Sequence, residues 1–493
     1  MVSLATWGSA LYTKAKLELA ENLVSQAINL LGHSSEKNHY RLATVLAYLA
    51  HNEQQRQIAG WVREWMAPGS PGSQFLNRVF QNIHPNVRKK YIAQTIVNLF
   101  FRDPGARNRF KAEHGFAPPG IMVISPSMRC NYRCVGCWAG QYTKKDDLPE
   151  DVFDRLLTEA KEMGIRYFVL TGGEPLVYEP LLRMFKKHDD AAFQMYTNGS
   201  LIDERMAEKL VELGNVAPQI SIEGFQSDTD LRRGQGAFGR CLRAMDNLSK
   251  AGGIFAFSCM VSRQNIDIAS GEEFIDLMIE KGAMTGWYFL YMPIGRNPDL
   301  SYMPTPQQRS QLRQAVERMR RTKPILLADF WGDSALTGGC IASGRIYLHV
   351  NHKGDVEPCV FNHFATHNIK ECSLAEALTS PFLQGLRGLQ PYGGNTLLPC
   401  PLIDHPQIQR MAVQKWGAYP THEGAESLVT WLSEGLDDYS TQIHQLYHPI
   451  WEEKYRPWAE PWKKTFDYTS RCFPPVEDEN NGCSAPVGCQ PLS

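Results

Sequence analysis

The 493-residue sequence lacks a long apolar run, a secretion signal and a strong net charge of either sign. No window reaches the roughly 18 apolar residues that a membrane-spanning helix needs. The first residues do not show a charged head, an apolar stretch and a small-residue cleavage site in that order. A formal charge of −1 gives no general attraction to nucleic acid. These absences predict a cytoplasmic protein without a nucleic-acid partner.

Cysteine is the residue type that the sequence has in unusual supply, with 12 copies. Disulfides are rare in a reducing compartment, so this number favours metal binding or catalysis over a disulfide framework. The length predicts two to four domains of roughly 150 residues each.

The first domain is expected to be helical and basic. Residues 1–118 carry 14 Lys and Arg against 7 Asp and Glu, and their apolar spacing is helical. Within them, 86–101 predicts an amphipathic helix with basic residues on its polar face. That helix either packs on the next domain or offers a basic, apolar surface to a membrane or an apolar substrate. The Pro/Gly-rich loop 115–120 predicts the end of the domain.

From residue 119 to 328, short apolar runs alternate with helical stretches and predict a parallel α/β sheet, open or closed into a barrel. The expected strands are 121–124, 167–170, 193–196, 219–222, 254–260 and 287–291. The expected helices lie near 150–163, 177–188, 203–213, 237–251 and 270–281. Ligands of such sheets bind at the carboxyl ends of the strands.

The pattern changes again after residue 328. The segment 346–359 predicts a β-hairpin around a turn at 351–355, and helices are expected near 373–378 and 407–417. We therefore expect a small domain over 329–410. A helical, aromatic-rich region over 411–493 would follow and end in a cysteine-containing tail.

Three cysteines, Cys130, Cys134 and Cys137, lie within the segment CNYRCVGCWAG. Thiolates favour zinc or iron–sulfur clusters, and this spacing lets one loop wrap a compact centre. A structural zinc site usually takes four ligands, whereas this loop offers three. The residues alone leave a cluster with one open iron, a zinc site and unligated thiols as alternatives, and the first is favoured.

The spacing Cys-x3-Cys-x2-Cys after the first strand of an α/β unit resembles the radical S-adenosylmethionine (radical SAM) superfamily. The resemblance implies a partial (β/α)6 barrel whose three catalytic cysteines hold a 4Fe-4S cluster. It also implies that SAM binds the fourth iron and is cleaved to methionine and a 5′-deoxyadenosyl radical. A reductase such as flavodoxin or ferredoxin would supply the electron.

Further motifs at successive strand ends carry the same resemblance. They are TGGEP at 171–175, YTNG at 196–199, SIEG at 221–224 and RRGQGAF at 232–238. Singly, each could be an ordinary strand-end turn with satisfied polar groups. Together they imply a SAM site formed by Gly172, Gly173, Glu174, Asn198, Ser221, Glu223 and Arg233.

One position departs from the family pattern. Many members have an aromatic residue directly before the third cysteine, where it lies along the adenine, and this chain has Gly136. Trp138 or Tyr132 is expected to supply the ring instead.

Cys340, Cys359 and Cys400 bracket and follow the predicted hairpin, and resemble a shortened SPASM or twitch extension that holds an auxiliary 4Fe-4S cluster. The fourth ligand stays open, because substrate could bind there or a further side chain could. The candidate side chains are Cys372, His405 and the tail residues Cys472, Cys483 and Cys489.

The flanking regions guide the choice of substrate. A basic amphipathic N-terminal domain and a Trp/Tyr-rich C-terminal region would suit a long apolar molecule at a membrane surface. We therefore expect hydrogen abstraction from an unactivated C–H bond of a lipid-like substrate, with C–C bond formation as one outcome and peripheral membrane contact. The first alternative is a peptide or protein maturase that crosslinks, oxidises or epimerises side chains. The second is a non-catalytic iron–sulfur electron-transfer or zinc protein.

Overall fold

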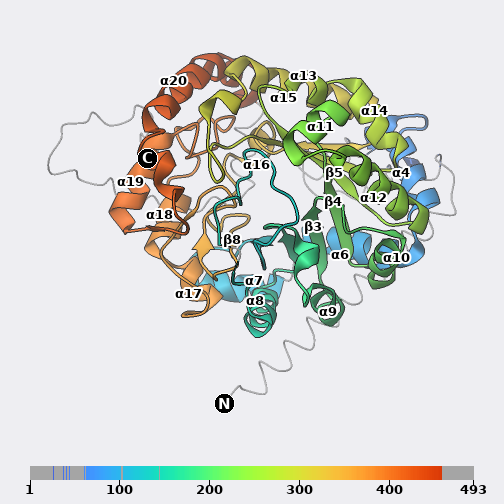
Figure 1. Cartoon of the computed structure of the whole chain (residues 1–493), viewed down its shortest axis with the longest axis horizontal. Coiled ribbons are helices and arrows are strands. Elements are labelled where there is room, and N and C mark those ends of the chain that lie inside the picture. Colours follow the sequence, from blue (N-terminus) through green and yellow to red (C-terminus); the bar gives the residue numbers. More distant parts are fainter. Residues whose placement is uncertain are drawn as a thin grey trace.

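The computed structural model describes residues 63–100, 104–143 and 145–457, together with isolated residues between 26 and 60. A curved sheet lies at the centre, helices surround its outer face, and the C-terminal helices gather beside one end (Figure 1). Within the described ranges, no helix is long and apolar enough to cross a membrane.

Seven parallel strands follow one another across the sheet in chain order. They are β1 (Met122–Ile124), β2 (Tyr167–Leu170), β3 (Ala192–Thr197), β4 (Val216–Ser221), β5 (Ala256–Val261), β6 (Thr285–Leu290) and β7 (Leu326–Asp329). The first six confirm the strands expected from sequence. β7 was not expected: it is a four-residue strand at the sheet's edge, two residues after Pro324. Because β1 and β7 do not pair, the parallel barrel is open.

Amphipathic helices cover the outer face of the sheet. They include α8 (Glu150–Glu162), α9 (Leu181–Lys187), α10 (Glu204–Leu213), α12 (Ala237–Ala251), α14 (Glu272–Glu280) and α15 (Pro306–Thr322). In α8 the buried residues are Phe153, Leu156, Leu157 and Ala160, a helical spacing of three and four. α8, α9, α10, α12 and α14 confirm the alternation that the sequence predicted, whereas α15 was not expected.

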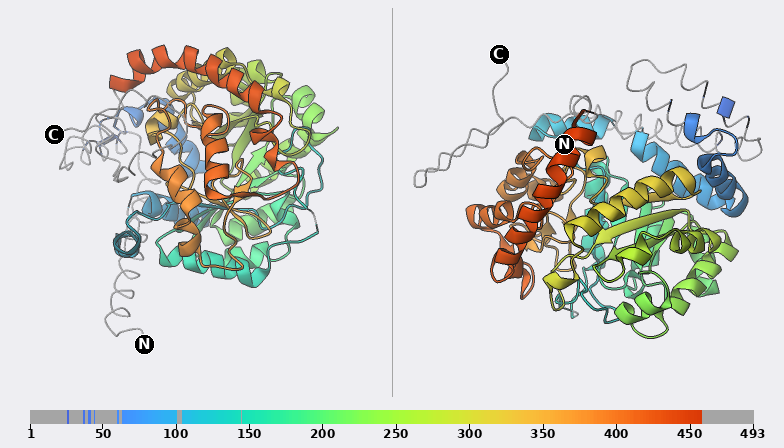
Figure 2. Two further views of the ribbon diagram at one scale, coloured as in Figure 1. Left: turned by 90° about the vertical axis from the view of Figure 1, so that its left-hand side faces the viewer. Right: turned by 90° about the horizontal axis from the view of Figure 1, so that it is seen from above.

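Helices of the N-terminal region close the end of the barrel where the strands begin. They are α4 (Pro71–Asn82), α5 (Pro85–Val87), η1 (Arg88–Ile92), α6 (Ala93–Phe100) and α7 (Pro104–His114), coloured blue to cyan in Figure 2. Val87 and Tyr91 are buried in one cluster with Ala192, Val211 and Ala217 of the barrel. The expected amphipathic helix therefore packs on the next domain, and this part of its apolar face is not exposed for a membrane.

The predicted hairpin is confirmed and extends the barrel sheet. β8 (His349–Val350) pairs antiparallel with β9 (Val356–Glu357) and also pairs parallel with β1, where Val123 lies opposite His349. The hairpin is therefore bonded to the strand that leads into the cysteine loop, residues 125–149.

The C-terminal region contains α17 (Leu374–Leu378), α18 (Pro381–Gly388), α19 (Pro406–Trp416) and α20 (Ser433–Ile450). α20 packs on α15 and α19, whereas α17 packs on α8. Arg309 of α15 forms a buried ion pair with Asp404, with Nη1 2.5 Å from Oδ1, and its guanidinium lies 5.3 Å from the ring of Tyr447. Trp451 is buried as well. Packing accounts for Tyr447 and Trp451 without a lipid, whereas Trp431 is exposed. Trp458 and Trp462 lie outside the described residues.

Candidate active site

The cysteine loop is held by two other segments. Arg296, beyond β6, donates from Nη1 to the carbonyl of Cys134 and from its backbone nitrogen to the carbonyl of Cys137, both at 3.0 Å. The backbone nitrogen of Val135 donates to the carbonyl of Arg232 at 2.9 Å. Cys130 is exposed, Cys134 is buried and Cys137 is intermediate. The loop's backbone is therefore fixed around Cys134 and Cys137.

Gly172 and Gly173 have a steric reason to be glycine. A Cβ at Gly172 would lie 2.3 Å from the carbonyl oxygen of Ser127, and one at Gly173 would lie 2.1 Å from that of Arg129. The backbone nitrogens of Gly173 and Glu174 donate to these two carbonyls, at 3.0 and 2.8 Å. The backbone at the end of β2 thus packs directly against the backbone of residues 127–129, which precede Cys130.

The Glu174 side chain is buried behind this contact. Its carboxylate accepts hydrogen bonds from the Leu176 backbone nitrogen at 3.1 Å, from Thr197 Oγ1 at 2.8 Å and from the Asn198 backbone nitrogen at 2.8 Å. Burial raises the pKa of Glu174, and the three hydrogen bonds oppose that shift. The hydrogen bonds to Thr197 and Asn198 join the end of β2 to the end of β3. Little of the carboxylate's capacity to accept hydrogen bonds is left for an amino group of SAM.

Glu223 and two arginines form a buried charged group with an excess of one positive charge. Arg232 donates to Glu223 at 2.9 Å and Arg233 at 2.7 Å, and the Arg233 Nε makes a second, shorter contact. Burial opposes ionisation of Glu223, but Arg233 and Arg232 outweigh it and lower its pKa. The uncompensated guanidinium charge faces the cavity, where a carboxylate would neutralise it.

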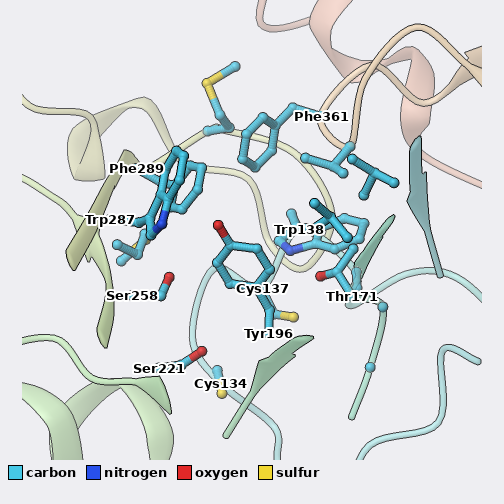
Figure 3. A pocket seen from close by; sticks show the side chains of 18 of the residues that line it. Cys134, Cys137, Trp138, Thr171, Tyr196, Ser221, Ser258, Trp287, Phe289 and Phe361 are labelled. Atoms are coloured by element: carbon cyan, nitrogen blue, oxygen red, sulfur yellow. The ribbon is translucent and has the colours of Figure 1, made fainter. Parts of the chain in front are cut away.

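A cavity of about 920 Å³ joins the expected SAM residues to an aromatic chamber inside the barrel (Figure 3). Ten predicted site residues line it: Cys130, Tyr132, Cys134, Cys137, Trp138, Gly172, Gly173, Asn198, Ser221 and Arg233. Glu174 and Glu223 are buried behind this lining. Thr171, Arg232 and Ser258, which the sequence analysis did not single out, also line the cavity, as do Tyr291 and Arg296, which the sequence places at or just after the sixth strand as candidates for facing the substrate. Thr171 and Arg232 stand within the quoted motifs, whereas Ser258 carries no motif signal.

The structure explains the departure at Gly136. This residue has φ +60°, and a Cβ there would lie 2.5 Å from the ring of Tyr291. An aromatic side chain could not fit, because Tyr291 fills the space. Trp138 packs edge-on against His349, with centroids 6.0 Å apart, whereas Tyr132 lies 5.2 Å from the guanidinium of Arg240. Their contact with adenine stays a prediction.

Cys340, Cys359 and Cys400 are partly buried beside the barrel and are electrostatic neighbours of one another. Burial raises the pKa of Cys400 well above its usual value, and Asp404 and the other two thiols add to the rise. Cys340 and Cys359 also pack against the cluster that contains Val123 and Val169 of the barrel. Three neighbouring thiols suit an iron–sulfur cluster.

The nearby candidates for a fourth ligand have other partners. The Cys372 thiol donates to the carbonyl of Asn368 at 3.3 Å, and Nε2 of His405 bonds the carbonyl of Leu398 at 2.9 Å. The three tail cysteines lie outside the described residues. Within the described ranges, no group of three His, Cys, Asp or Glu side chains is arranged to hold a single metal ion.

Glu357 connects the cysteine loop, the hairpin and the C-terminal region. Its buried carboxylate accepts hydrogen bonds from Tyr142 and Thr421 at 2.6 Å and from Asn351 at 2.9 Å, and it lies 2.6 Å from Nδ1 of His349. All four neighbours can donate to a carboxylate, which can accept about four hydrogen bonds.

Glu357→Gln is expected to lower the free energy of unfolding by about 3–5 kcal/mol, because it removes a buried charge and turns an NH2 group toward donors. Chemical denaturation monitored by circular dichroism would measure the change. Glu280→Gln, at an exposed helix end, is the control and should change stability by less than about 0.5 kcal/mol. Equal stability of the two variants would contradict the role of Glu357.

The buried His363 is expected to make the folded protein less stable in acid. Burial lowers its pKa from 6.5 to about 3. Between these values the unfolded chain binds a proton that the folded chain does not, so stability falls as pH drops below about 6.5. The melting temperature should differ less between pH 7.5 and pH 5.5 for His363→Gln than for the unchanged protein. For His367→Gln this difference should equal that of the unchanged protein. An equal reduction of the difference in both variants would refute the role of His363.

Comparisons with known proteins agree with this geometry. Residues 124–275 match the family model described as the radical SAM superfamily. Mycofactocin maturase MftC of Mycolicibacterium smegmatis is 29% identical over 265 residues, covering 50% of this chain and 66% of that protein. AdoMet-dependent heme synthase of Methanosarcina barkeri is 26% identical over 51% of this chain and 80% of that protein. PqqA peptide cyclase of Granulibacter bethesdensis is 24% identical, over 58% of this chain and 79% of that protein. The chain therefore spans slightly less than two thirds of MftC.

A solved structure shares the fold. Streptococcus suis SuiB bound to S-adenosylmethionine superposes with a TM-score of 0.52 at 17% identity, covering 67% of this chain and 87% of SuiB.

Proposed function

The chain belongs to the radical SAM superfamily and carries a SPASM-like extension, and on that premise we propose that it is a maturase of a peptide substrate. It would remove a hydrogen atom from one carbon of a peptide residue held inside the barrel. The observation that carries the proposal is the single cavity joining the three cysteines to the aromatic chamber.

One end of the cavity fits SAM and its cluster. A 4Fe-4S cluster on Cys130, Cys134 and Cys137 would supply the electron that cleaves SAM reductively. The excess charge of Arg232 and Arg233 would hold the carboxylate of SAM, since a buried guanidinium pairs strongly with a carboxylate. The hydroxyl and amide side chains of the lining, from β3 to β5, would bind the ribose.

The other end of the cavity combines aromatic walls with a polar floor. Trp287, Phe289 and Phe330 form walls. On the floor, Tyr167 donates to Gln194 Oε1 at 2.9 Å, and Gln194 Nε2 donates to the Tyr196 hydroxyl at 3.0 Å. Tyr196 projects into the middle of the cavity (Figure 3). Because the Tyr196 oxygen accepts the hydrogen bond from Gln194, the Tyr196 O–H is available to donate to a substrate.

A donor at that position favours a substrate that carries a hydrogen-bond acceptor, as every peptide does, over a plain hydrocarbon chain. Relatives named a maturase and a peptide cyclase support the same choice. The amphipathic N-terminal helix, in the part that the structure describes, and Trp451 in the C-terminal region are explained by packing. Trp431 is 66% exposed and has no such explanation. The peptide alternative therefore replaces the lipid-like substrate as our proposal.

The test uses anaerobically reconstituted full-length protein, SAM, dithionite and extracts of deuterated cells of the source organism. The extracts are divided into a peptide, a lipid and a tetrapyrrole fraction. We expect deuterium in 5′-deoxyadenosine only with the peptide fraction, and loss of that label after the fraction is digested with protease. Label from the lipid or tetrapyrrole fraction would overturn the proposal. The tetrapyrrole arm is included because of the heme synthase relative.

A further inference from the structure

Two aromatic residues of β6 point into the cavity together. Trp287 and Phe289 are two positions apart on the strand, so their side chains project from the same face of the sheet and line the cavity. Tyr288 lies between them in sequence and is buried on the other face, against Phe257. The strand pattern therefore presents two neighbouring rings to whatever occupies the chamber.

Further rings surround these two. The planes of Trp287 and Phe289 differ by only 12°, with centroids 6.1 Å apart. Phe289 also lies 5.2 Å from the ring of Phe330 and meets the ring of Tyr196 edge-on at 5.7 Å. Figure 3 shows Phe361 on another side of the same space. A group held in the chamber thus meets aromatic rings from several directions.

The charges of the cavity are all at its other end. Its charged lining residues are the four arginines Arg133, Arg232, Arg233 and Arg296. Arg133 belongs to the cysteine loop, Arg232 and Arg296 are hydrogen-bonded to that loop, and Arg233 follows Arg232. Among the residues that the structure describes, no Asp, Glu or Lys lines the cavity. The aromatic chamber is therefore uncharged, while the cavity as a whole favours anions over cations.

This distribution discriminates between kinds of side chain. An acidic group in the chamber would be a buried charge without a cationic partner there, which is costly. Aromatic faces can bind a cation, but four positive charges in the same cavity, with no acidic lining residue to offset them, oppose a lysine. An aliphatic group gains only from the burial of its surface. An aromatic ring gains from burial and also from edge-to-face and offset-stacked contacts with the surrounding rings.

We propose that the group held in this chamber is an aromatic ring, and that Trp287 is a specificity-determining residue for it. In a peptide, this group is the side chain of a phenylalanine, tyrosine or tryptophan residue. The inference deepens the proposed function and rests on it for the peptide, whereas the preference for a ring rests on the chamber alone.

The first experiment measures binding to the full-length protein, reconstituted anaerobically and supplied with SAM but no reductant. The probe is N-acetyl-para-fluorophenylalaninamide, observed by fluorine NMR. N-acetyltyrosinamide should displace it at about tenfold lower concentration than N-acetylleucinamide, because only the former makes ring contacts. Equal potency of the two competitors, or no binding of the probe at its solubility limit, would overturn the proposal.

Trp287→Leu should weaken binding of the fluorinated probe by about tenfold and change that of N-acetylleucinamide by less than about twofold. Trp431→Leu is the matched control, because Trp431 is 66% exposed and does not line the cavity. It should change neither affinity. Equal weakening of both ligands by Trp287→Leu would show a general disturbance of the cavity and would contradict the role of Trp287.

The second experiment needs no variant. Cells of the source organism are grown with one side-chain-deuterated amino acid at a time, and their peptide fraction is given to the unchanged enzyme with SAM and dithionite. Deuterium should reach 5′-deoxyadenosine from labelled phenylalanine, tyrosine or tryptophan, and not from labelled leucine, lysine or glutamate. Label from one of the latter three and from no aromatic residue would overturn this inference but keep the peptide assignment. Label only from a lipid or tetrapyrrole fraction would remove the peptide assignment, and the binding measurement would still decide whether the chamber prefers a ring.

Discussion

Cys134→Ala is expected to reduce dithionite-dependent formation of 5′-deoxyadenosine by more than about 100-fold and to remove about four irons per chain. The substitution leaves two thiolates where three are needed to hold the cluster. Arg296 bonds the backbone carbonyl of residue 134 and not its side chain, so the loop itself should keep its path. Iron analysis and chromatography of the reaction products would measure both effects.

Cys372→Ala is the control for this prediction. The Cys372 thiol bonds the Asn368 carbonyl and belongs to neither group of three cysteines. Its loss should leave the iron content and the reaction close to those of the unchanged protein. A Cys134→Ala protein that still cleaves SAM would remove the basis for the active site described above.

Gly173→Ala is also expected to impair the active site, although glycine has no side chain that could take part in the reaction. The added methyl would lie 2.1 Å from the Arg129 carbonyl oxygen, and backbone there cannot move without displacing the neighbouring Cys130. We expect cluster incorporation and 5′-deoxyadenosine formation to fall by more than about tenfold, in keeping with the effect of small displacements on catalysis.

Gly239→Ala is the matched substitution on α12. Its methyl would meet only the flexible end of Arg243, at 3.5 Å, and alanine is favoured over glycine within a helix. This variant should retain iron and activity and unfold at an equal or higher temperature. If Gly173→Ala behaved in the same way, the close approach of the two backbones would have no functional importance.

The strands and the motifs at their carboxyl ends could be predicted because both depend on short local patterns in the sequence. The six expected strands are short, largely apolar runs, as buried parallel strands are, and the motifs at their ends necessarily meet at one edge of the sheet. The roles of Glu174 and Glu223 could not be foreseen in the same way. Their partners, such as Thr197 and Arg232, are recognised only when neighbouring strands and α11 (Gln226–Arg233) lie side by side.

The lipid-like substrate was predicted from a pattern that has a second physical explanation. Amphipathic spacing shows that a helix has an apolar face, but it does not show what covers that face. Here Val87 and Tyr91 are covered by barrel residues, and Trp451 is likewise buried, whereas Trp431 is exposed. Most of the described side chains that suggested an apolar ligand are thus part of the protein's own core.

The pairing of β8 with β1 affects how this chain can be divided and how it folds. Ser125 and His349 meet across that pair at 2.7 Å although 224 residues separate them in sequence. A fragment that ends at residue 328 would leave the hydrogen-bonding groups of β1 unpaired at an exposed edge, which promotes aggregation. The strand that leads into the first three cysteines thus gains its second neighbour only after residues 349–350 have been synthesised. We therefore expect the catalytic loop to reach its final form late in folding, after most of the chain has left the ribosome.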